Sequence, residues 1–147
     1  GEPVADIRVR HSTLSGIDLP ETLVPDMIDE CPIFFVAAAL AKGRTRAAGL
    51  AELRVKESDR IASMVAGLRA MGAQVVETVD SVEIVGGLLQ GAEVDSFEDH
   101  RIAMSFALAA LRVSGVKIED PYCVSKTFPN YWDVLRGLDI AVDITQP

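Results

Sequence analysis

The stretch Pro32-Ile-Phe-Phe-Val-Ala-Ala-Ala-Leu40 contains no charged or polar side chain, and Gly43 follows it closely. Alanine and leucine favour a helix, and glycine is a common residue just past a helix end. A helix that is apolar on every side has to be buried on every side. This stretch therefore predicts an α-helix inside the fold, with other elements packed around it.

A second apolar stretch, Ile102-Ala-Met-Ser-Phe-Ala-Leu-Ala-Ala-Leu111, ends before Gly115 and predicts another buried helix. An amphipathic pattern predicts a helix over residues 59–71, and Pro129 suits the start of a shorter helix over about 130–138. Strands are predicted at residues 4–9, 45–50, 74–78, 82–85, 116–119 and 140–144, with a hairpin turn at 80–81. The fold class is therefore mixed α and β (α+β), with helices inside and sheets outside.

These features repeat along the chain. Each half has an acidic start, a buried helix, a glycine, a strand, a loop that contains lysine, and a second helix. The interval from Asp29 to Gly43 equals the interval from Arg101 to Gly115, although identity between the halves is low. We expect two repeat units, over about residues 19–97 and 98–147, and expect residues 1–18 to be strands of a preceding unit.

Composition excludes several classes of protein. The chain has 147 residues, of which 49% are hydrophobic, so it can bury a core of one-domain size. Its net charge of −8 argues against a nucleic-acid partner, because phosphate backbones bind basic surfaces. Without a membrane-spanning apolar run or a secretory pattern, we expect a cytoplasmic protein and no membrane contact. Cys31 and Cys123 lack metal-ligand spacing, so we expect buried thiols and no metal site.

The run Arg54-Val-Lys-Glu-Ser-Asp-Arg60 places five charged residues at the start of the amphipathic helix. One interpretation is a solvated loop, with Ser58 or Asp59 as the helix cap, and composition alone favours it. The other is an anion site at the positive end of the helix, with a glutamate present as a proton carrier. Its candidate residues are Lys56, Glu57 and Arg60.

Charges also adjoin both buried helices. His100 and Arg101 follow Asp99, a suitable cap, but cations at this end oppose the helix dipole, and a bound anion would remove that conflict. Lys126 precedes Pro129 in a loop, where most lysines are simply solvated; its place in the repeat matches Lys56. Three acids surround the start of the first buried helix, where acids are also common as caps: Asp26, Asp29 and Glu30.

Three strings resemble signature segments of the EPSP synthase family, the 3-phosphoshikimate 1-carboxyvinyltransferases, in order and spacing. They are Leu53-Arg-Val-Lys-Glu-Ser-Asp-Arg60, Asp99-His-Arg-Ile-Ala-Met104 and Ser125-Lys-Thr-Phe-Pro129, and Val24-Pro-Asp-Met-Ile-Asp-Glu30 also fits. The resemblance covers essentially the whole chain. It implies the enolpyruvyl transferase fold, an inverse α/β barrel of repeated βαβαββ-type units. The UDP-N-acetylglucosamine enolpyruvyl transferases share that fold, but we do not expect the Lys-Glu-Ser-Asp-Arg and Lys-Thr-Phe-Pro strings in them.

The resemblance implies a reaction and roles for particular residues. The enolpyruvyl group of phosphoenolpyruvate passes to the 5-hydroxyl of shikimate 3-phosphate, phosphate is released, and no metal or organic cofactor takes part. Glu57 and Asp29 match the catalytic carboxylates, with Asp26 as the alternative to Asp29. The residues that match the substrate-binding positions are Lys56, Arg60, His100, Arg101 and Lys126.

The resemblance further implies that the chain is the later part of a C-terminal domain. Family members have two domains that close over the substrates, and the N-terminal segments that bind shikimate 3-phosphate have no match in these 147 residues. We therefore expect the chain to require the N-terminal domain in cis and to be inactive alone. The alternative is a non-catalytic module that keeps the enolpyruvyl transferase fold.

Overall fold

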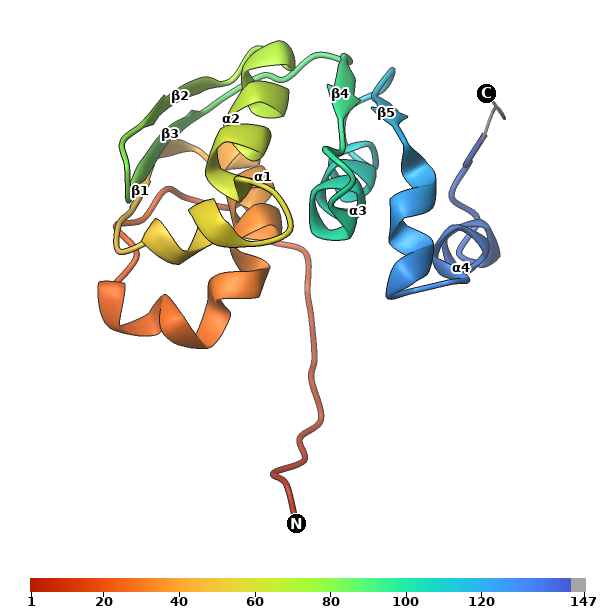
Figure 1. Cartoon of the computed structure of the whole chain (residues 1–147), viewed down its shortest axis with the longest axis horizontal. Coiled ribbons are helices and arrows are strands. Elements are labelled where there is room, and N and C mark those ends of the chain that lie inside the picture. The colour runs from red at the N-terminus through yellow and green to blue at the C-terminus, as the bar shows by residue number, and fades with distance from the viewer. Residues whose placement is uncertain (144–147) are drawn as a thin grey trace.

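The computed structural model describes residues 1–143 and has mixed helix and sheet structure. Helix α1 (Cys31–Leu40) packs against both α2 (Arg60–Ala70) and α3 (His100–Ala109). A three-stranded sheet covers α1 and α2, and the C-terminal helices lie beyond α3 (Figure 1). Large apolar side chains of all three helices are fully buried, so the core lies between the helices and the inner face of this sheet.

Helix α1 has no exposed residue, which confirms the prediction that the first apolar stretch is buried. The second stretch is less completely buried than we expected. Helix α3 begins two residues earlier than predicted and ends at Ala109, and Leu108 and Leu111 are 36% and 48% exposed. The prediction of burial all round is therefore wrong for the end of this helix, where Leu111 lines an open cavity.

The predicted strands of the first half form one antiparallel sheet in the order β1-β3-β2. Its strands are β1 (Gly43–Ala47), β2 (Gln74–Glu77) and β3 (Val82–Gly86). Alternate side chains, such as Val75 and Ile84 opposite each other in the register, are buried against the helices. The predicted hairpin turn is confirmed, since the Thr78 N–H donates to the Ser81 carbonyl at 2.9 Å.

A second, smaller sheet pairs β4 (Glu93–Asp95) with β5 (Lys117–Glu119) in parallel, with α3 as the crossover between them. Strand β4 was not predicted, because only Val94 of its three residues is buried and the segment is too short to show alternation. After β5 come the 3-10 helix η4 (Pro121–Lys126) and α4 (Tyr131–Gly137), the latter as predicted. Both pack on α3 through a small apolar cluster.

Two predicted strands are not observed. Residues 4–9 are not in a strand, and Val4, Ile7 and Val9 are 86–95% exposed; in Figure 1 this segment extends away from the body. A strand needs a partner edge, and no described residue supplies one to this segment. Residues 140–143 are also not in a strand, and residue 144 lies outside the described residues.

The remaining connections are 3-10 helices: η1 (Glu21–Leu23), η2 (Pro25–Glu30) and η3 (Ala51–Val55). The order of buried helix, strand, 3-10 helix and helix occurs twice, as α1-β1-η3-α2 and as α3-β5-η4-α4. The division into repeated βαβαββ-type units stays a prediction, since the strands around these helices differ in number and direction. In the described part of the chain, no helix has both the length and the apolar character that a bilayer crossing requires.

Candidate functional site

Arg60, the first residue of α2, is the centre of a network of ion pairs. Its side chain is only 1% exposed, and each of its three guanidinium nitrogens faces a carboxylate. Nε lies 2.8 Å from Oδ2 of Asp99, Nη1 lies 2.9 Å from Oδ1 of Asp29, and Nη2 lies 2.5 Å from Oε2 of Glu57. These three acids come from three separate segments, so one buried cation joins η2, the loop before α2 and the start of α3.

Asp99 is the fully buried partner in this network. It caps α3 by accepting the Arg101 N–H at 2.9 Å, as expected, and it also accepts from the Ser58 hydroxyl at 3.0 Å. Burial alone would raise the pKa of Asp99, but the hydrogen bonds from Arg60 and from the Arg101 N–H outweigh it and hold that pKa below its ordinary value. The cap was predicted from the sequence, but the ion pair between Asp99 and Arg60 was not.

Arg101 contacts Asp29 from the other side. Its Nη1 donates to the Asp29 carbonyl at 3.0 Å, and its Nη2 lies 3.4 Å from Oδ2 of Asp29. Glu30 lies 3.5 Å from Nη1. The cation at the start of α3 is thus offset by carboxylates of the chain itself. Arg60 and Arg101 share Asp29 and face the same site.

Lys56 and Glu57 complete the group from the loop before α2. Lys56 forms an ion pair with Glu52 and lies 3.8 Å from Oδ1 of Asp29. The hydrogen bond from Lys56 to Glu52 raises the pKa of the lysine. The side chains of Glu57 and Asp29 are 53% and 41% exposed, although Arg60 holds one oxygen of each. The structure therefore brings together five of the seven residues singled out in the sequence: Asp29, Lys56, Glu57, Arg60 and Arg101.

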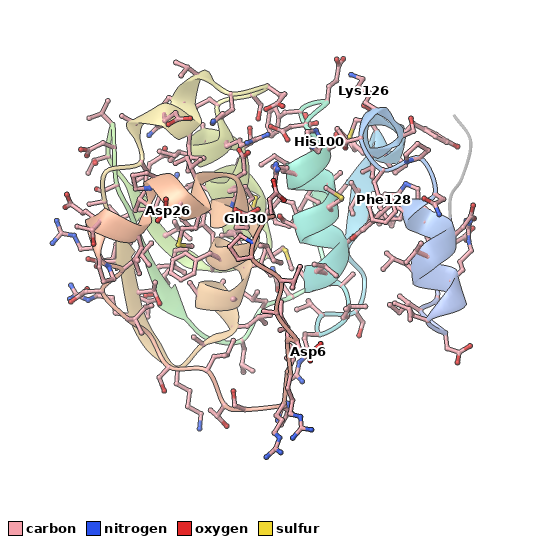
Figure 2. All side chains as sticks on the ribbon, turned by 90° about the horizontal axis from the view of Figure 1, so that it is seen from below. Asp6, Asp26, Glu30, His100, Lys126 and Phe128 are labelled. Carbon is pink, nitrogen blue, oxygen red and sulfur yellow. The ribbon has the colours of Figure 1, made fainter. Side chains whose placement is uncertain are left out.

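His100 and Lys126 lie at the edge of this group. His100 is half-buried in the first turn of α3, and Lys126 is exposed at the end of η4. Figure 2 shows Lys126 at the end of the molecule where α3 begins. Among the described residues, no hydrogen bond or ion pair of their side chains joins either one to the Arg60 network. Their place in the site remains a prediction.

Asp26, the alternative to Asp29, lies elsewhere. It is exposed on η2, and Figure 2 shows it well away from His100 and Lys126. In residues 1–143 its carboxylate has no hydrogen bond or ion pair, whereas Asp29 contacts two arginines. The geometry favours Asp29 as the acid of the site.

Arg54 positions the loop that supplies Lys56 and Glu57. It pairs with Asp59 at 2.9 Å and with Glu77 at 3.0 Å, and it donates to the carbonyl of Val79 at 3.2 Å. Asp59 in turn accepts the Ala62 N–H and is the cap of α2, which settles the earlier choice between Ser58 and Asp59. The loop is therefore tied to the β2–β3 hairpin and is not a freely solvated segment.

The acids near α1 also affect Cys31. Burial, followed by the charges of Glu30 and Asp29, raises the pKa of this thiol to about 11. Cys31 and Cys123 are both buried and unpaired by a disulfide, as predicted. Within residues 1–143, no cluster of three or more histidine, cysteine or acidic side chains is suited to hold a metal ion.

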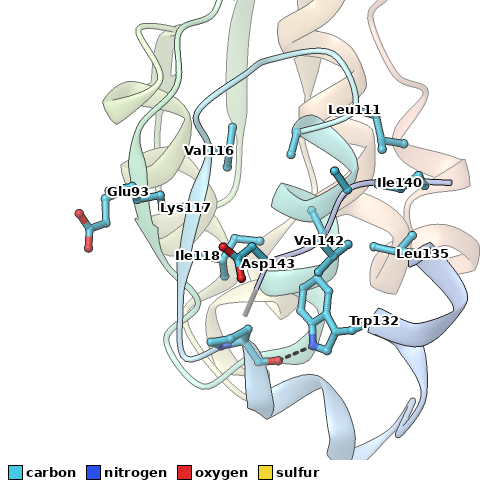
Figure 3. Close-up of a pocket in the computed structure, with 14 residues that line it drawn as sticks. Glu93, Leu111, Val116, Lys117, Ile118, Trp132, Leu135, Ile140, Val142 and Asp143 are labelled. Atoms are coloured by element: carbon cyan, nitrogen blue, oxygen red, sulfur yellow. Dashed lines mark hydrogen bonds between the residues drawn. The ribbon is translucent and has the colours of Figure 1, made fainter. Parts of the chain in front are cut away.

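A cavity among the described residues lies apart from this network. It has a volume of about 650 Å³ and is enclosed by the end of α3, β5, α4 and residues 140–143 (Figure 3). Apolar side chains such as Leu111, Val116 and Leu135 make up much of its wall, and the Trp132 Nε1–H donates to the Pro121 carbonyl at 3.0 Å beside it. It contains none of the predicted site residues.

Comparison with known proteins identifies the family. The family model described as EPSP synthase (3-phosphoshikimate 1-carboxyvinyltransferase) matches residues 1–135. A 3-phosphoshikimate 1-carboxyvinyltransferase of Xylella fastidiosa strain Temecula1 is 53% identical over 98% of this chain and 32% of its own length. The enzyme of that name from Xanthomonas oryzae pv. oryzae strain PXO99A is 49% identical over 99% of this chain and 33% of its own length.

A solved structure of EPSP synthase from Acinetobacter baumannii superposes with a TM-score of 0.87 at 43% identity, over 91% of this chain and 32% of that one. This chain thus spans about a third of the length of the relatives it matches. The family model, the relatives and the shared fold agree, and the chain belongs to the EPSP synthase family.

Proposed function

We propose that this chain supplies the phosphoenolpyruvate-facing wall of a 3-phosphoshikimate 1-carboxyvinyltransferase site. The observation that carries the proposal is that Arg60 holds two half-exposed carboxylates, Asp29 and Glu57, within one cluster that also contains Arg101 and Lys56. Carboxylates fixed in this way suit proton transfer, and the surrounding cations suit a substrate with a phosphate and a carboxylate.

The two acids have different tasks in this proposal. Asp29 accepts the proton of the 5-hydroxyl of shikimate 3-phosphate as its oxygen adds to C2 of phosphoenolpyruvate. Glu57, protonated at the start of this step, delivers its proton to the methylene carbon, which gives a tetrahedral intermediate. When phosphate leaves, Glu57 takes a proton back from that carbon, the proton held by Asp29 leaves with the phosphate, and the enolpyruvyl ether remains. Each carboxylate keeps one oxygen that does not contact Arg60. That oxygen of Asp29, Oδ2, lies 3.4 Å from Nη2 of Arg101, so an incoming hydroxyl shares it with this arginine.

The cations bind the substrate anions with unequal ease. Lys126 is exposed and His100 half-buried, so a phosphate or carboxylate can reach them directly. Arg101 is 32% exposed, but an anion that binds it competes with Asp29 and Glu30. Arg60 is fully paired, and an anion contacts it only by displacing Asp29 or Glu57. We therefore assign to Arg60 first the positioning of the two acids, and contact with substrate only after one of them moves.

A chimera tests this function. This chain replaces the matching third of the Xylella fastidiosa enzyme, and phosphate release is measured with phosphoenolpyruvate and shikimate 3-phosphate. We expect turnover by the chimera, loss of turnover in its Glu57→Gln variant, and no turnover by the 147-residue chain alone. A folded chimera without activity would instead support a non-catalytic module. Turnover by the chain alone would contradict the proposal that this chain supplies only one wall of the active site.

A further inference from the structure

Ser96 is a buried side chain that lies between two of the loops carrying proposed site residues. It follows β4, is 0% exposed, and precedes Asp99 by three positions. Its carbonyl accepts the Asp99 N–H at 3.0 Å. Its hydroxyl donates to the carbonyl of Asp120 at 3.3 Å and accepts from the thiol of Cys123 at 3.6 Å. One serine thus contacts both the start of α3 and the start of η4.

Both loops have unfavourable backbone conformations at this point. Phe97 and Glu98 have φ angles of 53° and 56°, and Asp120 has a φ angle of 46°. Residues other than glycine adopt this left-handed region at a cost, so surrounding contacts have to hold them there. The Asp95 carboxylate, which accepts the Phe97 N–H at 2.7 Å, and the Ser96 hydroxyl bond to Asp120 are such contacts.

These contacts lie in the two loops that lead to His100 and Lys126, so they affect the position of proposed site residues. Strands β4 and β5 are parallel, so their carboxyl ends lie at the same edge, and the loops that leave this edge lead to His100 and to Lys126. The Arg60 network holds the first loop through Asp99, but no ion pair in residues 1–143 ties η4 to that network. The placement of Lys126 therefore depends on apolar packing, on the Ser96 bridge and, through α4, on the Tyr131 hydroxyl that donates to the Met104 carbonyl of α3 at 3.3 Å.

We propose that Ser96 is a positioning residue that sets the distance of Lys126 from His100 and Arg101. This inference rests on the proposed function, in which these cations bind one anionic substrate together. Loss of the Ser96 hydroxyl leaves the Asp120 carbonyl and the Cys123 thiol without their partner, and η4 shifts or loosens relative to α3. The effect falls on the binding of phosphoenolpyruvate and leaves the proton-transferring acids in place, since Arg60 holds those separately.

The test compares three variants in the chimera and in the chain alone. Ser96→Ala removes the bridge, and Ser96→Thr keeps a hydroxyl. Ser105→Ala is the matched control, because it also removes a buried serine hydroxyl, but one that bonds only to the Arg101 carbonyl within α3. For Ser96→Ala we expect the KM for phosphoenolpyruvate to rise about 2- to 12-fold, the range of one neutral hydrogen bond, with kcat nearly unchanged. Ser96→Thr should restore KM, and Ser105→Ala should leave it unchanged.

Amide hydrogen exchange on the 147-residue chain provides the second measurement, which does not depend on turnover. Ser96→Ala should speed exchange in η4 by a similar factor, and Ser105→Ala should not. Unchanged exchange in η4 would overturn the bridge itself. Faster exchange with an unchanged KM would overturn the positioning role. If the unsubstituted chimera is inactive, the proposed function fails, and the exchange data still decide whether the bridge exists.

Discussion

The guanidinium of Arg60 and the carboxylate of Asp99 form an ion pair at 2.8 Å between side chains that are 1% and 0% exposed. A buried ion pair gives little net stability compared with apolar residues, but the loss of one partner leaves an unpaired charge inside the protein. Asp29 and Glu57 sit on the outer side of the same guanidinium and are half-exposed. The pair thus fixes the position of Arg60, and Arg60 in turn holds Asp29 and Glu57, the two acids to which we assign the proton transfers.

Replacement of Asp99 by asparagine should strongly destabilise the protein. The substitution removes one of the three carboxylates that face the buried guanidinium of Arg60, and we expect a loss of about 1.5–3 kcal/mol, the range of a hydrogen bond to a charged group, in the free energy of unfolding, measured in urea by circular dichroism. Asp133→Asn is the control, since it breaks an exposed pair with Arg136 and should change stability by less than about 1 kcal/mol. Equal small losses in both variants would contradict the anchoring role of Asp99.

The lowered pKa of Asp99 predicts that the stability of the protein depends on pH. The pKa of Asp99 is lower in the folded protein than in the unfolded chain, where it is about 3.9. At pH above that value both states are ionised and the full stabilisation is present; as the pH falls below it, the unfolded chain takes up the proton first and stability is lost. Urea unfolding between about pH 5 and pH 2 should show a smaller decline for Asp99→Asn than for the unsubstituted chain. If the free energy of unfolding declined equally with falling pH in both proteins, Asp99 would not contribute to the pH dependence of stability.

In the active chimera, the acids and cations of the site should affect different kinetic constants. Glu57→Gln should chiefly lower kcat, because it removes a proton carrier and leaves the binding cations in place. Arg101→Ala or Lys126→Ala should mainly raise the KM for phosphoenolpyruvate, by about 10- to 150-fold, which corresponds to about 1.5–3 kcal/mol for a hydrogen bond to a charged group. The exposed Lys117→Ala on β5 is the control for a general loss of positive charge. An unchanged kcat in Glu57→Gln would remove Glu57 from the mechanism.

The contact between α2 and α3 leaves no room at Gly67. A Cβ atom built there lies 2.2 Å from the ring of Phe106, a fully buried side chain of α3. Gly67→Ala should therefore lower stability by about 1–3 kcal/mol despite the higher helix propensity of alanine. Gly87→Ala, where a Cβ meets nothing within 4 Å, should stay within about 0.5 kcal/mol. Thermal unfolding compares the two, and a stabilised Gly67→Ala variant would contradict the tight contact.

The position of each element along the chain was largely predictable from local pattern. The absence of polar residues in 32–40 predicted the buried helix α1, and the runs on either side of the 80–81 turn predicted the sheet strands β2 and β3. The same method failed for residues 4–9. Local sequence describes which residues suit a strand, whereas strand formation also requires a partner edge, and that depends on parts of the chain distant in sequence.

The sequence by itself determined the family, the helices and the residue types of the site, because motifs, periodicity and caps are properties of neighbouring residues. Only the tertiary structure decided which charges meet. Arg60 lies 31 residues from Asp29 and 39 from Asp99 along the chain. Their contact arises because α1, α2 and α3 pack together and bring the starts of α2 and α3 and the end of η2 to one place. Ion pairing at a site is therefore a consequence of packing, and the order of residues alone does not specify it.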